Sequence, residues 1–386
     1  GAAAAGALLA GGLFFWRPKT RSLAVLPFKG SQPGDALGFG LADSTITRLA
    51  TSGLRVPSTQ AVRRFDTPGQ DPVQAGRQLG VETVLDGTLQ QAGGRVRLTV
   101  QLIRVADGQA LWAESFDRAA GDLFALEDSL ADALARQVNH RLSAQPVKAR
   151  GTSDAEAHRL YLLARYHFYK GFRDRAAMLE TIDYAGQAIA RDSGFAQPHV
   201  YRCGAYIQLA VSGAKPPREA MLEAKAAALR AVQLAPDFAE AHAALAAVQI
   251  FYDYDLRAAK ASIDRALRLE PENELALIQH SDYELVAGRF EESLRSRKRI
   301  QELIPLEPLW VADVAHPLFY AGRHEEALVW TRRALAMDPR FPLANTDLIL
   351  ILRQAGRDRE AVEAALARRP DAALALHDFS DLRAGT

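Results

Sequence analysis

The sequence has almost none of the residue type that sulfur chemistry requires. Its 386 residues include one cysteine, Cys203. An intrachain disulfide and a cysteine-based metal cluster are therefore both excluded. A lone cysteine is most often a small buried apolar residue, and we expect Cys203 to be one.

An excess of either charge is also missing. The chain has 47 basic and 46 acidic residues, for a formal net charge of +1. This balance excludes the overall field that a bulk nucleic-acid or acidic-membrane binder uses, so a polyanionic partner must be met locally. With 48% apolar residues, the length predicts two or more globular domains.

Charge is absent from the first sixteen residues, GAAAAGALLAGGLFFW. As a helix they would span about 24 Å, less than the roughly 30 Å of a hydrocarbon core. This run ends with the aromatic residues Phe14, Phe15 and Trp16, and the basic residues Arg17 and Lys19 come next. An aromatic belt followed by a basic edge is typical of a membrane interface. We expect residues 1–17 to be the last part of a truncated transmembrane helix, with a signal-peptide core or a buried helix as alternatives.

From Ser22 to Leu142, short β runs alternate with helical ones. Asp71 and Gly80 have the chemistry of a helix start and a helix end. The order βαβαβββα predicts a mixed sheet with helices packed against it. We expect strands at 22–28, from 54, at 81–91, 95–105 and 109–117, and helices at 38–53, 71–80 and 122–142.

No catalytic arrangement is recognisable in this region. GFG at 38–40 is placed like a phosphate-binding turn between a strand and a helix, but it lacks the ending of a P-loop. Trp112 is expected in the core. The carboxylates stand at turns, caps or strand ends, where structural carboxylates are common: Asp35, Asp43, Asp86 and Glu114. We expect no enzyme activity and no cofactor.

The same stretches carry a family resemblance. SLAVLPF, GLADSTITRLA, GRQLGVETVLDGTLQQAGGRVRLTVQLIRVADGQALWAESFDR and DLFALEDSLA resemble the TolB amino-terminal-like domain over residues 22–142. In proteins that look like this, the domain usually follows a single membrane span. A winged-helix DNA-binding domain, as in CadC-like regulators, or a class III adenylate cyclase domain then precedes the span.

After a Pro, Gly and Ser linker at 143–153, the chain repeats itself. Prolines recur at 236, 271, 305 and 339, with separations of 35, 34 and 34 residues. This period, with alanines at fixed offsets, resembles the tetratricopeptide repeat. We expect five to six helical hairpins over 154–370, stacked into a right-handed superhelix with a concave face, and a cap and tail at 371–386. FYDYD at 251–255 is expected to be a hairpin turn.

The concave face is the candidate binding surface. Its predicted residues are Ile250, Phe251, Ile278, Asp282, Leu285, His316, Phe319, Tyr320 and Arg353. This mostly apolar and aromatic set favours a hydrophobic peptide or another protein segment as the partner. The alternative is that the groove packs on the first domain or on the repeats themselves.

Two further sets of residues have simple explanations. No two histidines have the i, i+4 spacing that, together with a carboxylate, a zinc site on a helix needs, so no metal is expected. The basic cluster Arg295, Arg297, Lys298 and Arg299 is expected to be a solvated helix face.

Together these features predict a fold of class α/β plus all-α, a small mixed-sheet domain followed by a repeat solenoid. The favoured function is the non-catalytic sensory and protein-interaction region of a membrane-anchored regulator, with a DNA-binding domain upstream. An adenylate cyclase sensory region and a periplasmic assembly adaptor are the alternatives. The resemblance implies an inner-membrane protein with a periplasmic region after residue 21, whereas the basic residues after Trp16 favour the cytoplasm.

Overall fold

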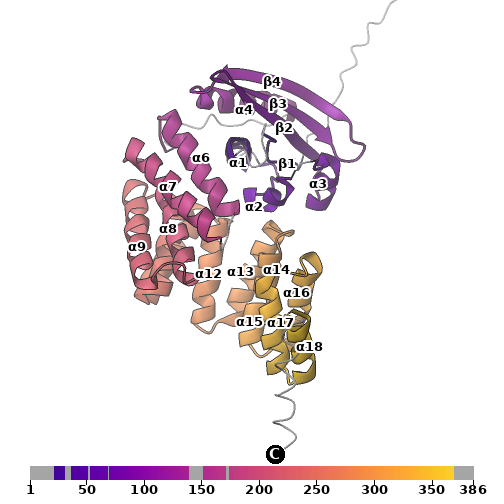
Figure 1. Cartoon of the computed structure of the whole chain (residues 1–386), viewed down its shortest axis with the longest axis vertical. Coiled ribbons are helices and arrows are strands. Elements are labelled where there is room, and N and C mark those ends of the chain that lie inside the picture. Colours follow the sequence, from indigo (N-terminus) through magenta and orange to yellow (C-terminus); the bar gives the residue numbers. More distant parts are fainter. Residues whose placement is uncertain are drawn as a thin grey trace, which may run out of the picture.

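A computed structural model describes residues 21–30, 36–50, 53–67, 69–138, 151–170 and 174–368. It contains a small α/β domain followed by an arc of paired helices (Figure 1), which confirms the predicted fold class. The elements of the α/β domain are β1 (Leu23–Val25), α1 (Ala36–Ala50), α2 (Thr59–Val62), the 3-10 turn η1 (Arg63–Phe65), α3 (Pro72–Leu79), β2 (Thr83–Ala92), β3 (Arg95–Arg104), β4 (Ala110–Ala119) and α4 (Leu123–Val138).

The sheet is mixed, as predicted, with strand order β1-β2-β3-β4. β1 is parallel to β2, and the other two pairs are antiparallel hairpins. Gly93 and Gly94 adopt positive φ in the turn between β2 and β3, which glycine does at little cost. Helix α3 begins with Asp71 accepting a hydrogen bond from the Val73 amide and ends at Gly80 in the left-handed region.

Two local predictions in this domain are wrong. The strand expected from Leu54 is only an isolated bridge between Ser22 and Arg55, because helix α2 begins at Thr59. GFG lies inside α1 and not before it. A Cβ on Gly38 would stand 2.1 Å from the carbonyl oxygen of Phe28, so this glycine permits close packing of α1 on the end of β1.

The helical arc consists of hairpins, and the repeated prolines precede the first helices of four of them. Six hairpins are formed by the described residues. Their helices are α6 (Ala155–Lys170) with α7 (Arg175–Arg191), α8 (Gln197–Val211) with α9 (Pro217–Leu234), α10 (Ala239–Val248) with α11 (Leu256–Leu269), α12 (Glu274–Val286) with α13 (Phe290–Leu303), α14 (Pro308–Asp313) and α15 (Ala315–Tyr320) with α16 (His324–Met337), and α17 (Pro342–Gln354) with α18 (Asp358–Arg368).

Small residues hold the hairpins together where the period places them. Ala327 and Ala334 are fully buried, as expected of positions where two helices approach closely. In the preceding repeat, Ser293 takes the place of the first alanine, and its hydroxyl lies 2.9 Å from that of Ser281. The packing there is therefore rearranged around a buried polar pair.

FYDYD forms the turn between α10 and α11, as predicted. Its first residues belong to a π-helical turn, η2 (Gln249–Asp253), and Tyr254 has a φ of 54°. Asp255 then accepts a hydrogen bond from the Ala258 amide and starts α11.

The α/β domain is joined to the arc by α1 packing along α6. Phe39 and Tyr166 meet edge to face at 5.3 Å between ring centroids. Gly40 lies against Leu162, where a Cβ would stand 2.7 Å from the Leu162 Cβ. One turn before Leu162 on α6, His158 Nε2 lies 3.0 Å from Glu127 Oε1 of α4, and both side chains are buried.

The substitution Gly40→Ala should therefore weaken this junction. Overpacking costs about 1–3 kcal/mol, and the higher helix propensity of alanine offsets up to about 1 kcal/mol of it. We expect the free energy of unfolding to fall by about 1–2 kcal/mol in a denaturant titration. Gly121→Ala is the control because no heavy atom lies within 4 Å of its added Cβ. Equal stability of the two variants would contradict the close approach.

Candidate protein-interaction surface

The α2–η1 segment of the α/β domain, residues 59–65, occupies part of the inner side of the arc (Figure 1). Arg63 forms an ion pair of 2.6 Å with Glu307, at the start of α14, and also donates to the Tyr169 carbonyl. Arg64 donates to the Leu306 carbonyl at 2.8 Å. The alternative that the groove packs on the first domain thus holds for this part of the arc.

A buried ion pair lies behind this segment. Arg165 Nη2 of α6 lies 2.7 Å from Asp43 Oδ1 of α1, with the side chains 16% and 1% exposed. Thr59 also donates to Asp43. Burial raises the pKa of Asp43, although the charge of Arg165 and the Thr59 hydroxyl oppose this change.

Three tyrosines surround the Arg165 guanidinium. The ring centroids of Tyr161, Tyr169 and Tyr201 lie 5.6, 6.0 and 5.4 Å from its central carbon. Burial raises the pKa of all three phenols, so they stay neutral. The Tyr161 hydroxyl accepts a hydrogen bond from Arg165 Nη1 at 2.9 Å. The arrangement is a closed, cation-filled aromatic cluster.

Two glutamates at the beginnings of first helices also face this region. Burial raises the pKa of Glu240 and of Glu274 from 4.5 to about 7. Ser58, Arg165 and Gln60 oppose the change at Glu274, which places this carboxyl beside the α2–η1 segment. One carboxylate oxygen of each glutamate is buried without a hydrogen-bond partner in the described part of the chain.

The predicted groove residues of the third and fourth repeats have different surroundings. Ile250 is buried, 3% exposed, in a cluster with Ile263 of α11, so its side chain is not presented on the surface. Phe251 is 45% exposed. Ile278 is half-buried against the main core, and Leu285 is half-buried near the end of α12.

Asp282 and His316 belong to an ionic network centred on Arg297. The Arg297 guanidinium binds Asp282 and also Asp313, the latter at 2.7 Å. His316 Nε2 lies 3.2 Å from Asp347 Oδ2. Burial lowers the pKa of His316, but its bond to Asp347 and the charge of Asp313 outweigh this effect, so that the net change is upward.

This network corrects the interpretation of the basic cluster. Arg297 is 5% exposed and is not part of a solvated face, whereas Lys298 next to it is exposed. Alternate residues of a charged helix face different sides, and the sequence alone does not show that Arg297 has two carboxylates opposite it. Arg295 and Arg299 form exposed pairs with glutamates.

A row of exposed side chains lies at the last residue of the first helices. Val211 is 70% exposed, Val286 is 58% exposed and Tyr320 is 61% exposed, each two residues before a turn glycine of positive φ. Gln354 holds the same place in the last described repeat. Of the predicted groove residues, Tyr320 belongs to this row, Phe319 is half-buried beside it, and Arg353 is exposed next to Gln354.

We name Val211, Val286 and Tyr320 the exposed apolar row. Exposed apolar side chains that recur at one place in several repeats are typical of a protein-binding surface. The sequence signal was the residue before Ala-Gly or Ser-Gly in the second, fourth, fifth and sixth hairpins. Of these residues, only Tyr320 is among the predicted groove residues.

Several other predictions concern single residues. Cys203 is buried, as predicted, and burial raises the pKa of its thiol to about 12. Trp112 is half-buried against the core. Within the described ranges, three or more His, Cys, Asp or Glu side chains nowhere gather in a way that could hold a metal ion.

The predicted membrane segment lies outside the described residues. This applies to Phe14, Phe15, Trp16, Arg17 and Lys19. From residue 21 onward, the helices that the structure describes are too short or too polar to cross a bilayer.

Comparison with protein families gives one match, to the α/β domain. Residues 19–133 match the family described as "HilA/YgeH-like transcriptional regulator, second domain". The TolB amino-terminal-like assignment is not confirmed by this match and stays a prediction.

Part of the chain is also similar to part of a longer curated protein. The chain is 32% identical over 155 residues to "Putative adenylate cyclase 3" of Rhizobium meliloti (strain 1021), over 38% of this chain and 26% of the relative. The chain therefore spans about a quarter of the length of that relative.

The solved structures that resemble the chain are helical repeat proteins. YrrB, "a TPR protein with an unusual peptide-binding site", is 20% identical over 51% of this chain and 97% of its own, with a TM-score of 0.35. TTC0263, a thermophilic TPR protein of Thermus thermophilus, is 20% identical over 51% and 94%, with a TM-score of 0.36.

The Arg297 network gives the first prediction for this region. Arg297→Met leaves Asp282 and Asp313 buried without their counter-charge, which costs about 3–5 kcal/mol. We expect a loss of that size in the free energy of unfolding, measured by denaturant titration. Lys298→Met, on the same helix but exposed, should change it by less than about 0.5 kcal/mol. Similar losses in both variants would contradict the network.

The second prediction concerns pH. The pKa of Glu274 is higher in the folded chain than the ordinary 4.5, so its contribution to stability is present below pH 4.5 and is lost as the pH rises through about 7. Glu274→Gln removes this loss. We expect the variant to match the parent near pH 4.5 and to exceed it by up to about 3 kcal/mol at pH 8.

The measurement is the free energy of unfolding of both proteins from pH 4.5 to pH 8. Glu272→Gln is the control, because Glu272 is exposed and its carboxylate pairs with Arg299 at the surface. Parallel pH curves for the parent and Glu274→Gln would show that this carboxyl is not desolvated.

Proposed function

We propose that this chain is the non-catalytic sensory and protein-interaction region of a membrane-anchored bacterial transcriptional regulator. The observation that carries the proposal is the match of residues 19–133 to the second domain of HilA/YgeH-like transcriptional regulators. In this proposal a winged-helix DNA-binding domain precedes Gly1, residues 1–17 complete a single inner-membrane span, and the region after residue 21 lies in the periplasm.

The partner is a protein or an apolar peptide segment. Two features of the repeats support this part of the proposal: the exposed apolar row and the inner side of the arc beyond the α2–η1 segment. A partner transmits a signal only if it binds one arrangement of the two units more tightly than another. Arg63 contacts Glu307, and Gln60 contacts Trp310, through polar groups. In this proposal, binding of the partner changes these contacts between the α/β domain and the arc.

A second function is supported by the curated relative. The similarity to an R. meliloti protein named as an adenylate cyclase favours a sensory region of a class III adenylate cyclase. The same repeats would then regulate cyclic AMP formation by a domain outside this chain. The two candidates share the interaction surface and differ in the output.

The test uses the complete gene product with Val286→Ser and Tyr320→Ser combined. These exposed side chains contribute little to folding, so we expect an unchanged melting temperature and a loss of most of the output. The output is measured as transcription from the regulator's own promoter region and as cellular cyclic AMP. Loss of the transcriptional output supports the regulator, and loss of cyclic AMP supports the cyclase.

The control combines Val329→Ser and Val362→Ser. Val329 is 64% exposed and Val362 is 43% exposed, but they lie on the second helices α16 and α18. Their substitution should leave the output unchanged. If both double variants give the parent output, the exposed apolar row does not bind the partner.

A further inference from the structure

The strand β4 is a long free edge of the sheet. It is the last strand in the order β1-β2-β3-β4, and it has ten residues. In the part of the chain that the structure describes, β3 is the only strand that pairs with it, and Figure 1 shows it at the rim of the molecule. A free edge of this length is a template for pairing with another strand.

The register with β3 shows which residues of β4 direct their backbone outward. Thr99 faces Ser115, and their hydroxyl oxygens are 2.9 Å apart, which is typical of the close pair in an antiparallel ladder whose backbone groups point away from each other. In agreement, the Ala120 amide, of opposite parity, donates to the Gly94 carbonyl. The amides and carbonyls of Ser115 and Asp117 therefore point to the free side.

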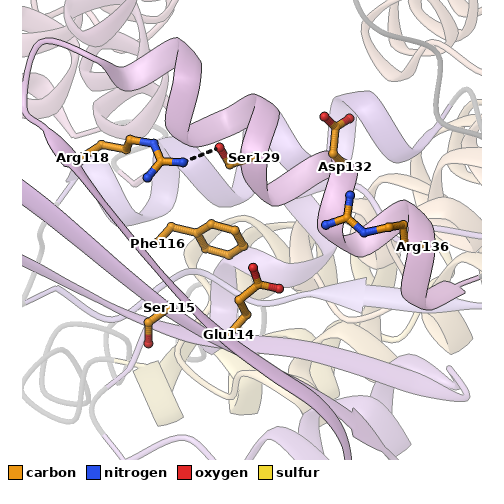
Figure 2. A pocket seen from close by; sticks show the side chains of 7 residues that line it. All are labelled: Glu114, Ser115, Phe116, Arg118, Ser129, Asp132 and Arg136. Carbon is orange, nitrogen blue, oxygen red and sulfur yellow. Dashed lines mark hydrogen bonds between the residues drawn. The ribbon is translucent and has the colours of Figure 1, made fainter.

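A hollow of about 460 Å³ lies between β4 and α4. Figure 2 shows Glu114, Phe116 and Arg118 on the side of β4 that faces α4, with Ser115 on the other side. Arg118 donates to Ser129 of α4 at 3.0 Å and to the Asp117 carbonyl, which leaves further donors of its guanidinium available. Glu114 forms no ion pair with another described residue.

The charges along β4 are complementary to those of a second antiparallel copy. If the two-fold axis passes beside Phe116, Glu114 of one copy stands opposite Arg118 of the other, and the reverse pair forms across the axis. Ser115 then stands opposite Asp117, and both have outward backbone groups. Opposite charges at such positions stabilise strand pairing.

Other registers are disfavoured by the same residues. Placing the axis beside Glu114 brings two glutamates together, and placing it beside Arg118 brings two arginines together. Like charges directly opposite each other destabilise a pair of strands. An axis beside Ser115 brings no like charges together but places Glu114 opposite Phe116, so the axis beside Phe116 is the one that pairs Glu114 with Arg118 on both sides.

We propose that two copies of this chain pair through their β4 edges in this register, joining two four-stranded sheets into one. The partner is a second copy, because the charge pattern is complementary to itself. This pairing is independent of the proposed function and of the exposed apolar row, which belongs to the repeats.

The first test measures the mass of the full 386-residue chain by light scattering after size exclusion, in a mild detergent. The monomer has a mass of 42.1 kDa, and we expect twice that value for the parent. Glu114→Arg alone and Arg118→Glu alone should each raise the dimer dissociation constant about tenfold or more, because two like-charge pairs replace two opposite ones. The combined exchange Glu114→Arg with Arg118→Glu should restore the dimer.

Glu363→Arg, an exposed charge reversal on α18, is the control and should leave the dimer intact. A monomeric parent at about 100 µM, where a specific dimer of micromolar affinity would form, overturns the proposal. So does a dimer that neither single charge reversal weakens.

A second test does not depend on altered charges. In the proposed register, Ala113 stands opposite Ala119 of the second copy, and both are exposed. The double variant Ala113→Cys with Ala119→Cys should form covalent dimers with a short thiol cross-linker, and each single variant should not. The native Cys203 is buried and does not interfere. Absence of cross-linking in the double variant, or equal cross-linking in the single ones, contradicts the register.

Discussion

Arg165 reaches from the first repeat helix to Asp43 of the α/β domain, and both groups are removed from water. Burying either charge alone costs several kcal/mol, so each holds the other in place. The rings of Tyr161, Tyr169 and Tyr201 fill the remaining space around the guanidinium. This pair fixes α6 against α1. Because α6 belongs to the first hairpin and each hairpin packs on the one before it, the position of the later hairpins relative to the α/β domain depends on this pair. The position of α14 beneath the α2–η1 segment follows from it.

The two ends of the contact between the units differ in character. Near α6 the contact is a packed core, with Gly40 against Leu162 and Phe39 against Tyr166. Near α14 polar contacts are added to apolar packing: Val62 and Trp310 are buried in the same core cluster, and the Arg63–Glu307 ion pair lies beside them with side chains 24% and 15% exposed.

The features that the sequence made predictable are those with a local cause. The prolines at 236, 271, 305 and 339 each stand three residues before a helix, since proline cannot continue the preceding one. The features that were missed have a distant cause. Arg297 is buried because Asp282 and Asp313 from two neighbouring helices lie opposite it, and no spacing along α13 shows this. The reason for a glycine at position 38 is also distant, because the carbonyl group that lies against it belongs to Phe28, ten residues earlier.

The two ends of the first helices in the arc have different surroundings: one end contacts the α/β domain, and the other is exposed. The beginnings of α12 and α14 face the α2–η1 segment, where Glu274 and Glu307 contact the chain's own first domain. The opposite ends of the first helices carry Val286 and Tyr320, which are exposed although apolar. The first turns of these helices therefore contact the α/β domain, and their last turns expose apolar side chains to solvent. β4 lies at the other end of the molecule from α15 and α17 (Figure 1). Pairing of two copies through β4 therefore leaves the exposed apolar row accessible.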